Sequence, residues 1–367
     1  AEFGDNGLTR LDDREGGVSP SLTDASVTFR HFAGGGTDNH WNPGVNVRIG
    51  QFKMPLADEG SRGIMAYDYI NFSEVTRQQV NERFVRANKS PADDPDLTGF
   101  DGGIAGYRDI GVQLFDVIKV SDKWEATWAA AVGNGNGRNR TDNDDNQDYY
   151  LRAQAAYVFD GVSRGGPRRE DLKLFAWTQR GERRFDQDGN GTFESDERDF
   201  ERNRNGVGFH FYKQPYRFSG EYIWGSGMVF DGVAPPVSDP GFNKGNGNVG
   251  TSDVRPYMAP SEDNEFNGWY VEGAYFLIPN KLGVQARYDV LNRMTSQADD
   301  YRASIGDRER KFETITLGLQ YWNHPVKGQW QINYRIRDLS APDNDVADDI
   351  GDSMGNEIGI QYFLLFK

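Results

Sequence analysis

Residues 329–339 of the chain read QWQINYRIRDL, and residues 358–366 read IGIQYFLLF. In both stretches every second residue is apolar, and in the first stretch glutamine, asparagine and arginine fill the positions between. The same alternation runs through residues 282–294 (LGVQARYDVLNRM) and 44–55 (GVNVRIGQFKMP). A period of two is typical of a β-strand whose two faces meet different surroundings. The sequence therefore predicts long strands with one apolar and one polar face.

Strand-like stretches of this kind recur along the whole chain, separated by segments rich in turn-forming residues. Thirteen of them span residues 24–32, 44–55, 108–118, 124–135, 149–159, 172–183, 204–213, 216–230, 267–278, 282–294, 312–324, 329–339 and 355–367. Most have about ten residues or more, whereas the usual globular strand has about five or six. A tilted strand needs about nine to eleven residues to cross a bilayer, so these lengths favour a membrane protein.

The connections alternate between short and long. Short ones such as 214–215 and 279–281 take turns with long ones such as 56–107 and 231–266. A soluble antiparallel sheet also alternates apolar and polar residues, but nothing in it requires every long loop to lie at one end. Outer-membrane barrels have short periplasmic turns and long external loops. We therefore predict an all-β chain, a transmembrane antiparallel β-barrel of about 14–16 strands, as a single domain over residues 1–367.

Composition excludes several other classes of protein. The chain has 41 Lys and Arg against 56 Asp and Glu, a net charge of −15, which argues against nucleic acid as a partner. Aromatic residues make up 13% of the chain, more than a disordered acidic chain contains. There is no cysteine, so disulfides and thiolate metal sites are excluded. No run of about 18 apolar residues is present, which excludes a membrane-spanning helix.

Two short motifs carry a family resemblance. Residues 47–55 (VRIGQFKMP) and 108–114 (RDIGVQL) resemble the phosphate-selective porin O and P family of Gram-negative outer membranes. The resemblance implies a barrel of about sixteen strands, usually trimeric, that conducts small anions or other small solutes. It also implies that residues 56–107 form the pore-constriction loop, because in that family the two motifs flank this loop. The chain ends in Phe366 and Lys367, where a terminal phenylalanine is common in outer-membrane barrels.

The residues that line the pore are predicted from strand parity, that is, from whether a residue lies on the polar or the apolar face of its strand. The arginines on the polar faces of the predicted strands are Arg30, Arg48, Arg152, Arg217, Arg287, Arg335 and Arg337. A column of arginines lowers the energy of a permeating anion, which predicts a preference for anions. The same parity places acidic residues on this face (Asp109, Glu221, Glu272 and Asp289). The alternative is therefore that some of these arginines form structural ion pairs. Selectivity for phosphate does not follow.

One acidic segment matches a calcium-binding loop. Residues 186–197 (DQDGNGTFESDE) fit the twelve-residue EF-hand loop, with Gly191 at the sharp turn. The expected Ca²⁺ ligands are Asp186, Asp188, Asn190, Thr192, Glu194 and Glu197. We expect this motif on an external hairpin loop at residues 184–203 rather than between two helices. The alternative is a solvated acidic loop without a metal.

Enzymatic motifs are not found. The four histidines are dispersed, the GxSxG motif is absent, and the glycine-rich segments lack the Lys and Ser/Thr of a phosphate-binding loop. The sequence therefore predicts a non-enzymatic porin in the Gram-negative cell outer membrane, a passive diffusion channel for small hydrophilic or anionic solutes. Its expected partners are outer-membrane lipid and two further copies in a homotrimer, with no nucleic acid. The alternative is a secreted, calcium-stabilised all-β binding protein or adhesin.

The first residues bear on the number of strands. The stretch at 24–32 follows a long connection, so residues 1–4 would be the end of a preceding strand. Four residues cannot cross a bilayer, and backbone groups left unpaired in lipid are costly. We therefore expect further strands upstream of Ala1, which would bring the total to about sixteen.

The calcium motif gives a first testable prediction. Isothermal titration with CaCl₂ should show binding in the range of extracellular sites, about 10⁻⁴ to 10⁻³ M. Glu197→Gln should abolish the signal, because Glu197 occupies the position of the bidentate ligand. The matched control is Glu182→Gln, a substitution outside the motif that should leave the heats unchanged. Equal heats in the parent protein and Glu197→Gln would mean that no site exists here.

Overall fold

The computed structural model describes most of the predicted strands and part of their connections. The described residues are 2–3, 22–34, 43–62, 67–81, 107–135, 137, 145–161, 169–184, 199–230, 258–259, 264–279, 281–296, 309–324, 328–340 and 355–364. The predicted calcium motif at 186–197 lies outside them.

A single antiparallel sheet of fourteen strands dominates the fold. Its strands are β1 (Glu2–Phe3), β2 (Leu22–Gly34), β3 (Gly44–Lys53), β4 (Arg108–Lys119), β5 (Trp124–Gly133), β6 (Asp148–Val158), β7 (Asp171–Arg184), β8 (Asp199–Lys213), β9 (Tyr216–Gly227), β12 (Glu265–Ile278), β13 (Leu282–Ser296), β14 (Arg310–His324), β15 (Gly328–Ser340) and β16 (Glu357–Leu364). Each strand pairs with the next in this order, from β1 to β16. The thirteen predicted strands and the short strand at residues 1–4 are thus confirmed in number and order.

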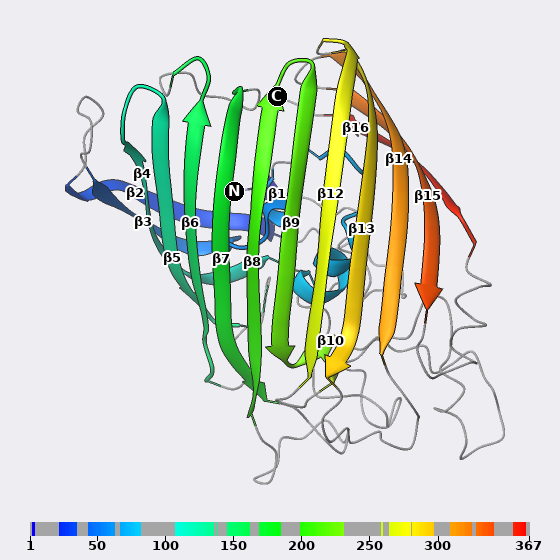
Figure 1. The fold of residues 1–367 in the computed structure, drawn as a ribbon. Coiled ribbons are helices and arrows are strands. Elements are labelled where there is room, and N and C mark those ends of the chain that lie inside the picture. Colours follow the sequence, from blue (N-terminus) through cyan, green and yellow to red (C-terminus); the bar gives the residue numbers. More distant parts are fainter. Residues whose placement is uncertain are drawn as a thin grey trace, which may run out of the picture.

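The sheet is strongly curved, and neighbouring strands run in opposite directions (Figure 1). Short turns such as Gln214–Pro215 join β8 to β9 at the upper ends in this view, and the connections that follow β9 and β13 leave from the lower ends. Consecutive strands of the sheet pair with each other, so their backbone amide and carbonyl groups are hydrogen-bonded within the protein. A sheet that crosses a membrane requires this.

The two faces of the sheet have opposite chemistry. On β14 and β15, Ile315 and Ile332 are 43% and 41% exposed, and similarly exposed apolar side chains occur on every long strand of the sheet. Their chain neighbours Thr316 and Gln331 are buried on the other face. A soluble monomer rarely exposes an apolar patch larger than a few hundred Å². The convex face is therefore lipid-facing, which disfavours the alternative of a secreted binding protein.

Most described strand boundaries lie within two residues of the sequence prediction, and the largest differences concern β8 and β9. The connection between β7 and β8 covers residues 185–198 instead of 184–203, because β8 begins at Asp199. Residues 199–203 (DFERN) escaped detection because this part of the strand lacks the apolar alternation. The predicted strand 216–230 ends at Gly227, whose φ of 87° turns the chain out of the extended conformation. Beyond it, β10 (Val229–Phe230) pairs with β11 (Met258–Ala259) in a separate two-stranded sheet.

The apolar core lies on the concave side, between the sheet and the segment that follows β3. Leu56, Ala57, Val75 and Val80 of this segment pack with inward residues of the sheet such as Phe266. The segment contains a short helix α1 (Asp58–Ser61) and a single π-helical turn η2 (Thr76–Val80), visible behind β12 and β13 in Figure 1. Residues 74–80 of the segment are helical, and residues 82–106 lie outside the described part. Among the described residues, no helix has the length and apolar character to span a membrane.

Candidate functional site: a segment docked on the polar wall

The candidate site is the contact between the segment at 54–81 and the polar face of the sheet. Of this segment, residues 54–62 and 67–81 are described. Gly268 of β12 shows how closely the two approach, because a Cβ atom added there would lie 2.7 Å from Cβ of Val75. Glycine at this position is therefore required for the segment to reach the wall. The described residues contact the wall in three successive parts.

The first part is α1 with Arg62, and its contacts are mainly ionic. The Asp58 backbone amide donates to Glu221 Oε2 of β9 at 3.0 Å. Arg62 donates from Nη1 to Glu272 Oε1 of β12 at 2.6 Å and from Nη2 to Ser219 Oγ at 2.8 Å. Its Nε donates to Asp58 Oδ2 at 2.9 Å within the segment. These bonds tie α1 to the middle of the wall.

The second part, residues 67–70, is held mainly by amide side chains of the wall. Gln331 Nε2 donates to the Tyr67 carbonyl at 2.5 Å, and Gln320 Nε2 donates to the Asp68 carbonyl at 3.0 Å. Gln285 also donates to the Asp68 carbonyl. Asn333 Oδ1 accepts from the Ile70 amide at 2.7 Å. The wall side chains therefore satisfy backbone groups of an irregular segment that has no ladder of its own.

The third part leads into η2 and combines ionic and backbone contacts. The Glu74 amide donates to Asp289 Oδ1 of β13 at 2.8 Å, and the Glu74 carboxylate pairs with Arg335 of β15 at 2.7 Å. Arg204 of β8 donates from Nε to the Gln79 carbonyl at 2.9 Å. Because β8, β13 and β15 all contribute, the segment bridges strands that are distant in the sheet order.

Nearby arginines and burial have opposite effects on the pKa values of the carboxyl groups of the segment. Burial alone would raise the pKa of Asp58, but Arg62 and Arg152 outweigh burial and hold this pKa at about 2, below the ordinary 3.8. For Glu74, burial is likewise outweighed by Arg77 and Arg335, which lower its pKa from 4.5 to about 2. Glu59 differs, because burial raises its pKa despite the nearby Arg287.

The predicted pore arginines fall into two groups. Arg152, Arg217, Arg287 and Arg335 contact the segment: they pair with Asp58 (3.6 Å), Asp68, Glu59 (3.1 Å) and Glu74 (2.7 Å), respectively. The remaining three, Arg30, Arg48 and Arg337, form no ion pair with the described part of the segment, and Arg337 instead lies 3.6 Å from Glu357. The four arginines of the first group thus form ion pairs, as the alternative interpretation of the sequence proposed for some of these residues.

Arg48, of the second group, is partly buried against aromatic rings. Its Nε donates to Thr28 Oγ1 at 3.3 Å, and its guanidinium lies 5.5 Å from the ring centroid of Phe52 and 5.1 Å from that of Phe115. Arg30 is exposed on β2, and Arg337 donates to the Gly355 carbonyl at 2.6 Å. Within the described part of the chain, neither Arg30 nor Arg48 forms an ion pair.

Several contact residues were not predicted from the sequence. Asp58, Glu59, Arg62 and Glu74 lie in an irregular segment, where no strand parity nominates them. Arg204 and Arg293 follow the polar parity of their strands and could have been nominated by the same rule as Arg287. Among the described residues, no group of three or more His, Cys, Asp or Glu side chains is arranged to hold a metal. Calcium binding at 186–197 stays a prediction.

No protein-family model matches the chain, and no curated protein sequence matches it. Solved structures with a similar arrangement of strands include the outer-membrane expressed OmpT of Vibrio cholerae, with 10% identity over 83% of this chain and 70% of that chain, at a TM-score of 0.43. An anion-selective porin from Comamonas acidovorans aligns with 14% identity over 82% of this chain and 66% of that chain, at a TM-score of 0.40. The outer membrane channel DcaP of Acinetobacter baumannii aligns with 13% identity over 89% and 75%, at a TM-score of 0.38.

These likenesses are distant, and the sheet itself indicates where the chain lies. A long-stranded antiparallel sheet with an apolar convex face and a polar concave face is the architecture of bacterial outer-membrane β-barrels. It places the chain in the outer membrane of a Gram-negative cell.

The carboxyl pKa values predict that acid loosens the segment. Because the pKa values of Asp58 and Glu74 are lower when the segment is docked, their contribution is complete above the ordinary values of 3.8 and 4.5 and is lost as the pH falls towards about 2. Protonation of Glu59 opposes this trend, since it removes a buried charge. A spin label on Ser61→Cys, a single site in a cysteine-free chain, should be immobile at pH 5 and mobile at pH 2.

The control for this measurement is the Ser61→Cys variant that also carries Asp58→Asn and Glu74→Gln. Its label should be more mobile than the parent label at pH 5 and should change less on acidification. A parent spectrum that is unchanged down to pH 2 would contradict the assignment.

Proposed function

We propose that the chain is an outer-membrane porin, a passive diffusion channel for small hydrophilic solutes that is narrowed by the segment at 54–81. The observation that carries this proposal is the docking of residues 54–62 and 67–81 on the polar concave face. A segment that only capped the outer end of the sheet would contact strand ends. This one reaches residues in the interior of β9, β12 and β13, such as Ser219, Glu272 and Arg287.

The chemistry of the wall suits passive diffusion. Its inward side chains are charged or amide groups from many strands, which replace part of the hydration shell of a polar solute. The arginines and carboxylates described above are largely paired with each other, so the wall offers hydrogen bonds without a deep electrostatic well. Weak, repeated interactions let a solute enter and also leave.

A preference for anions is supported by unequal pairing of charges. The carboxylates of the segment and of the middle of the wall, such as Glu59, Glu272 and Asp289, have arginine partners. Arg48, in contrast, has no ion-pair partner among the described residues and stacks on aromatic rings. Arg48 therefore adds a positive charge to the path without a carboxylate at ion-pair distance among the described residues, which favours small anions.

The resemblance to the phosphate-selective porin O and P family supports the same direction. Its two motifs end β3 and begin β4, on either side of the long connection that contains the docked segment. On this basis we also propose a homotrimer, and from the EF-hand motif we propose an external calcium site at 186–197. Phosphate itself is not assigned as the solute.

Conductance tests the proposed narrowing. In planar lipid bilayers the protein should form open channels, and a variant in which residues 58–81 are replaced by a short Gly-Ser linker should conduct at least about twice the current, because the segment no longer fills the lumen. The control is the removal of residues 241–250 from another long connection, which should leave the conductance unchanged. An unchanged current in the 58–81 variant would refute the placement, and the absence of channels in the parent protein would refute the function.

Ion preference tests the role of Arg48. Under a KCl gradient, Arg48→Gln should lower the anion-to-cation permeability ratio by about twofold, because one uncompensated positive charge leaves the path. Arg169→Gln is the control, since Arg169 lies in the β6–β7 connection and pairs with Glu125 at 2.9 Å. Equal shifts of the reversal potential in both variants would mean that Arg48 has no special role.

A further inference from the structure

Two oppositely charged wall residues lie side by side under the segment. Glu272 of β12 and Arg287 of β13 are register partners in the antiparallel pairing of these strands. Both are buried, with 4% and 1% of their surface exposed. Two buried charges of opposite sign on adjacent strands give the wall a local charge order, negative on β12 and positive on β13.

The segment presents the complementary order. Within one helical turn it carries Glu59 and Arg62, and each contacts the wall residue of opposite sign. Arg62 Nη1 lies 2.6 Å from Glu272 Oε1, and Arg287 Nη1 lies 3.1 Å from Glu59 Oε1. We call these four residues the charge square. A shift of the segment by one strand would bring charges of like sign together, so the square permits one register.

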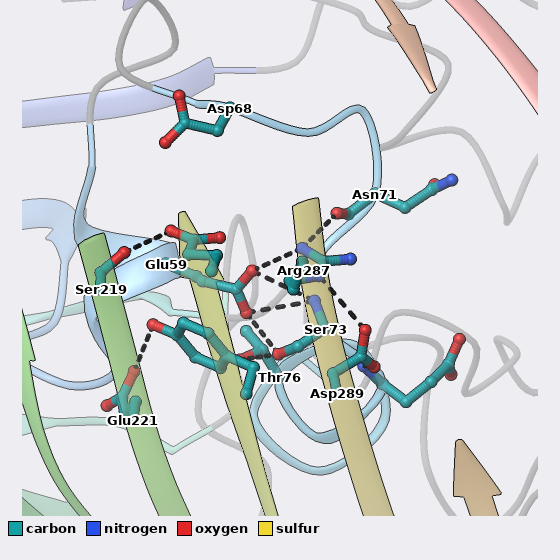
Figure 2. A network of polar contacts seen from close by, with 12 residues as sticks. Glu59, Asp68, Asn71, Ser73, Thr76, Ser219, Glu221, Arg287 and Asp289 are labelled. Carbon is teal, nitrogen blue, oxygen red and sulfur yellow. Dashed lines mark hydrogen bonds and ion pairs between the residues drawn. The ribbon is translucent and has the colours of Figure 1, made fainter. Parts of the chain in front are cut away.

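Neighbouring groups fix the orientation of the square. Glu59 accepts hydrogen bonds from the Ser73 backbone amide at 3.1 Å, which joins α1 to the approach to η2. Figure 2 shows Glu59 between Ser73 and the wall residue Arg287. Three further carboxylates face the arginines: Asp58 lies 2.8 Å and Asp68 3.8 Å from Arg62, and Asp289 lies 3.2 Å from Arg287. The square therefore contacts α1, the residues that lead into η2, and the wall.

We propose that the charge square of Glu59, Arg62, Glu272 and Arg287 sets the register of the docked segment and thereby the size limit of the channel. This inference rests on the proposed porin function and deepens it. The square carries no net charge, so it acts on the size of the solute that passes and not on the sign of its charge. Ion preference belongs to other residues, such as Arg48.

Exchange of the charges tests the proposal. All variants are made in a background with Asp58→Asn, Asp68→Asn and Asp289→Asn, which removes the three carboxylates that would repel an introduced glutamate. The wall exchange is Glu272→Arg with Arg287→Glu, and the segment exchange is Glu59→Arg with Arg62→Glu. Single-channel conductance in KCl and the exclusion of polyethylene glycols of graded size are measured for each variant in planar bilayers.

Each exchange alone should change the conductance at least twofold and shift the polyethylene glycol cut-off, because both contacts between the segment and the wall become repulsive. The variant that carries both exchanges should return to the values of the background, since every contact is again attractive. Glu125→Arg with Arg169→Glu, which exchanges an ion pair away from the segment, should leave both quantities unchanged. A cut-off that is identical in all variants, or a double exchange without recovery, would overturn the inference.

If an exchanged variant does not fold, as judged by gel migration with and without heating, neutral variants replace it. Glu59→Gln with Arg287→Gln removes one matched pair, and Glu59→Gln with Glu272→Gln removes two carboxylates and leaves two buried arginines. The second variant should change the cut-off more than the first, and equal changes would overturn the inference. A parent protein without conductance would instead refute the porin function itself.

Discussion

Every backbone amide and carbonyl that crosses the hydrocarbon of a membrane must find its partner within the protein, and the architecture of this chain depends on that constraint. The sheet meets it by pairing each long strand with its neighbour in the sequence, from β2 to β16. This order requires hairpins, and tight ones such as Gln214–Pro215 suffice at one end. At the other end the connections are free to be long, and one of them turns inward.

The backbone groups of the segment on the concave side also need hydrogen-bond partners within the protein. Residues 67–70 form no ladder of their own, and the amide side chains of Gln285, Gln320 and Gln331 satisfy their carbonyl groups. Neutral amides suit this task, because they bind backbone groups without leaving an uncompensated charge. Charged contacts are concentrated on either side, around Arg62 and Glu74. The segment is thus anchored by two kinds of interaction that respond differently to acid.

Charged residues of the wall that form ion pairs hold the segment in place, whereas a charged residue outside these pairs can influence ion preference. The chain as a whole carries −15, yet the middle of the wall is close to neutral because its carboxylates face arginines of the wall or of the segment. Breaking such a buried pair leaves one charge without a partner, which typically costs about 3–5 kcal/mol. These residues are therefore constrained by docking. A residue outside the pairs, such as Arg48, is the kind of residue at which the ion preference can change without loss of the fold.

The sequence by itself determined the number, order and face polarity of the strands, because alternation with a period of two reports directly on two different surroundings. Strand parity also placed Arg287 and Arg335 on the polar face. Parity does not report on contacts between segments that are distant in the chain. It could not distinguish Arg287, which pairs with Glu59 and Asp289, from Arg48, which forms no ion pair with the described residues. The partners Glu59 and Arg62 lie in an irregular segment without periodicity. Only the tertiary structure decided that they meet Arg287 and Glu272, because that contact depends on the path of the segment across several strands.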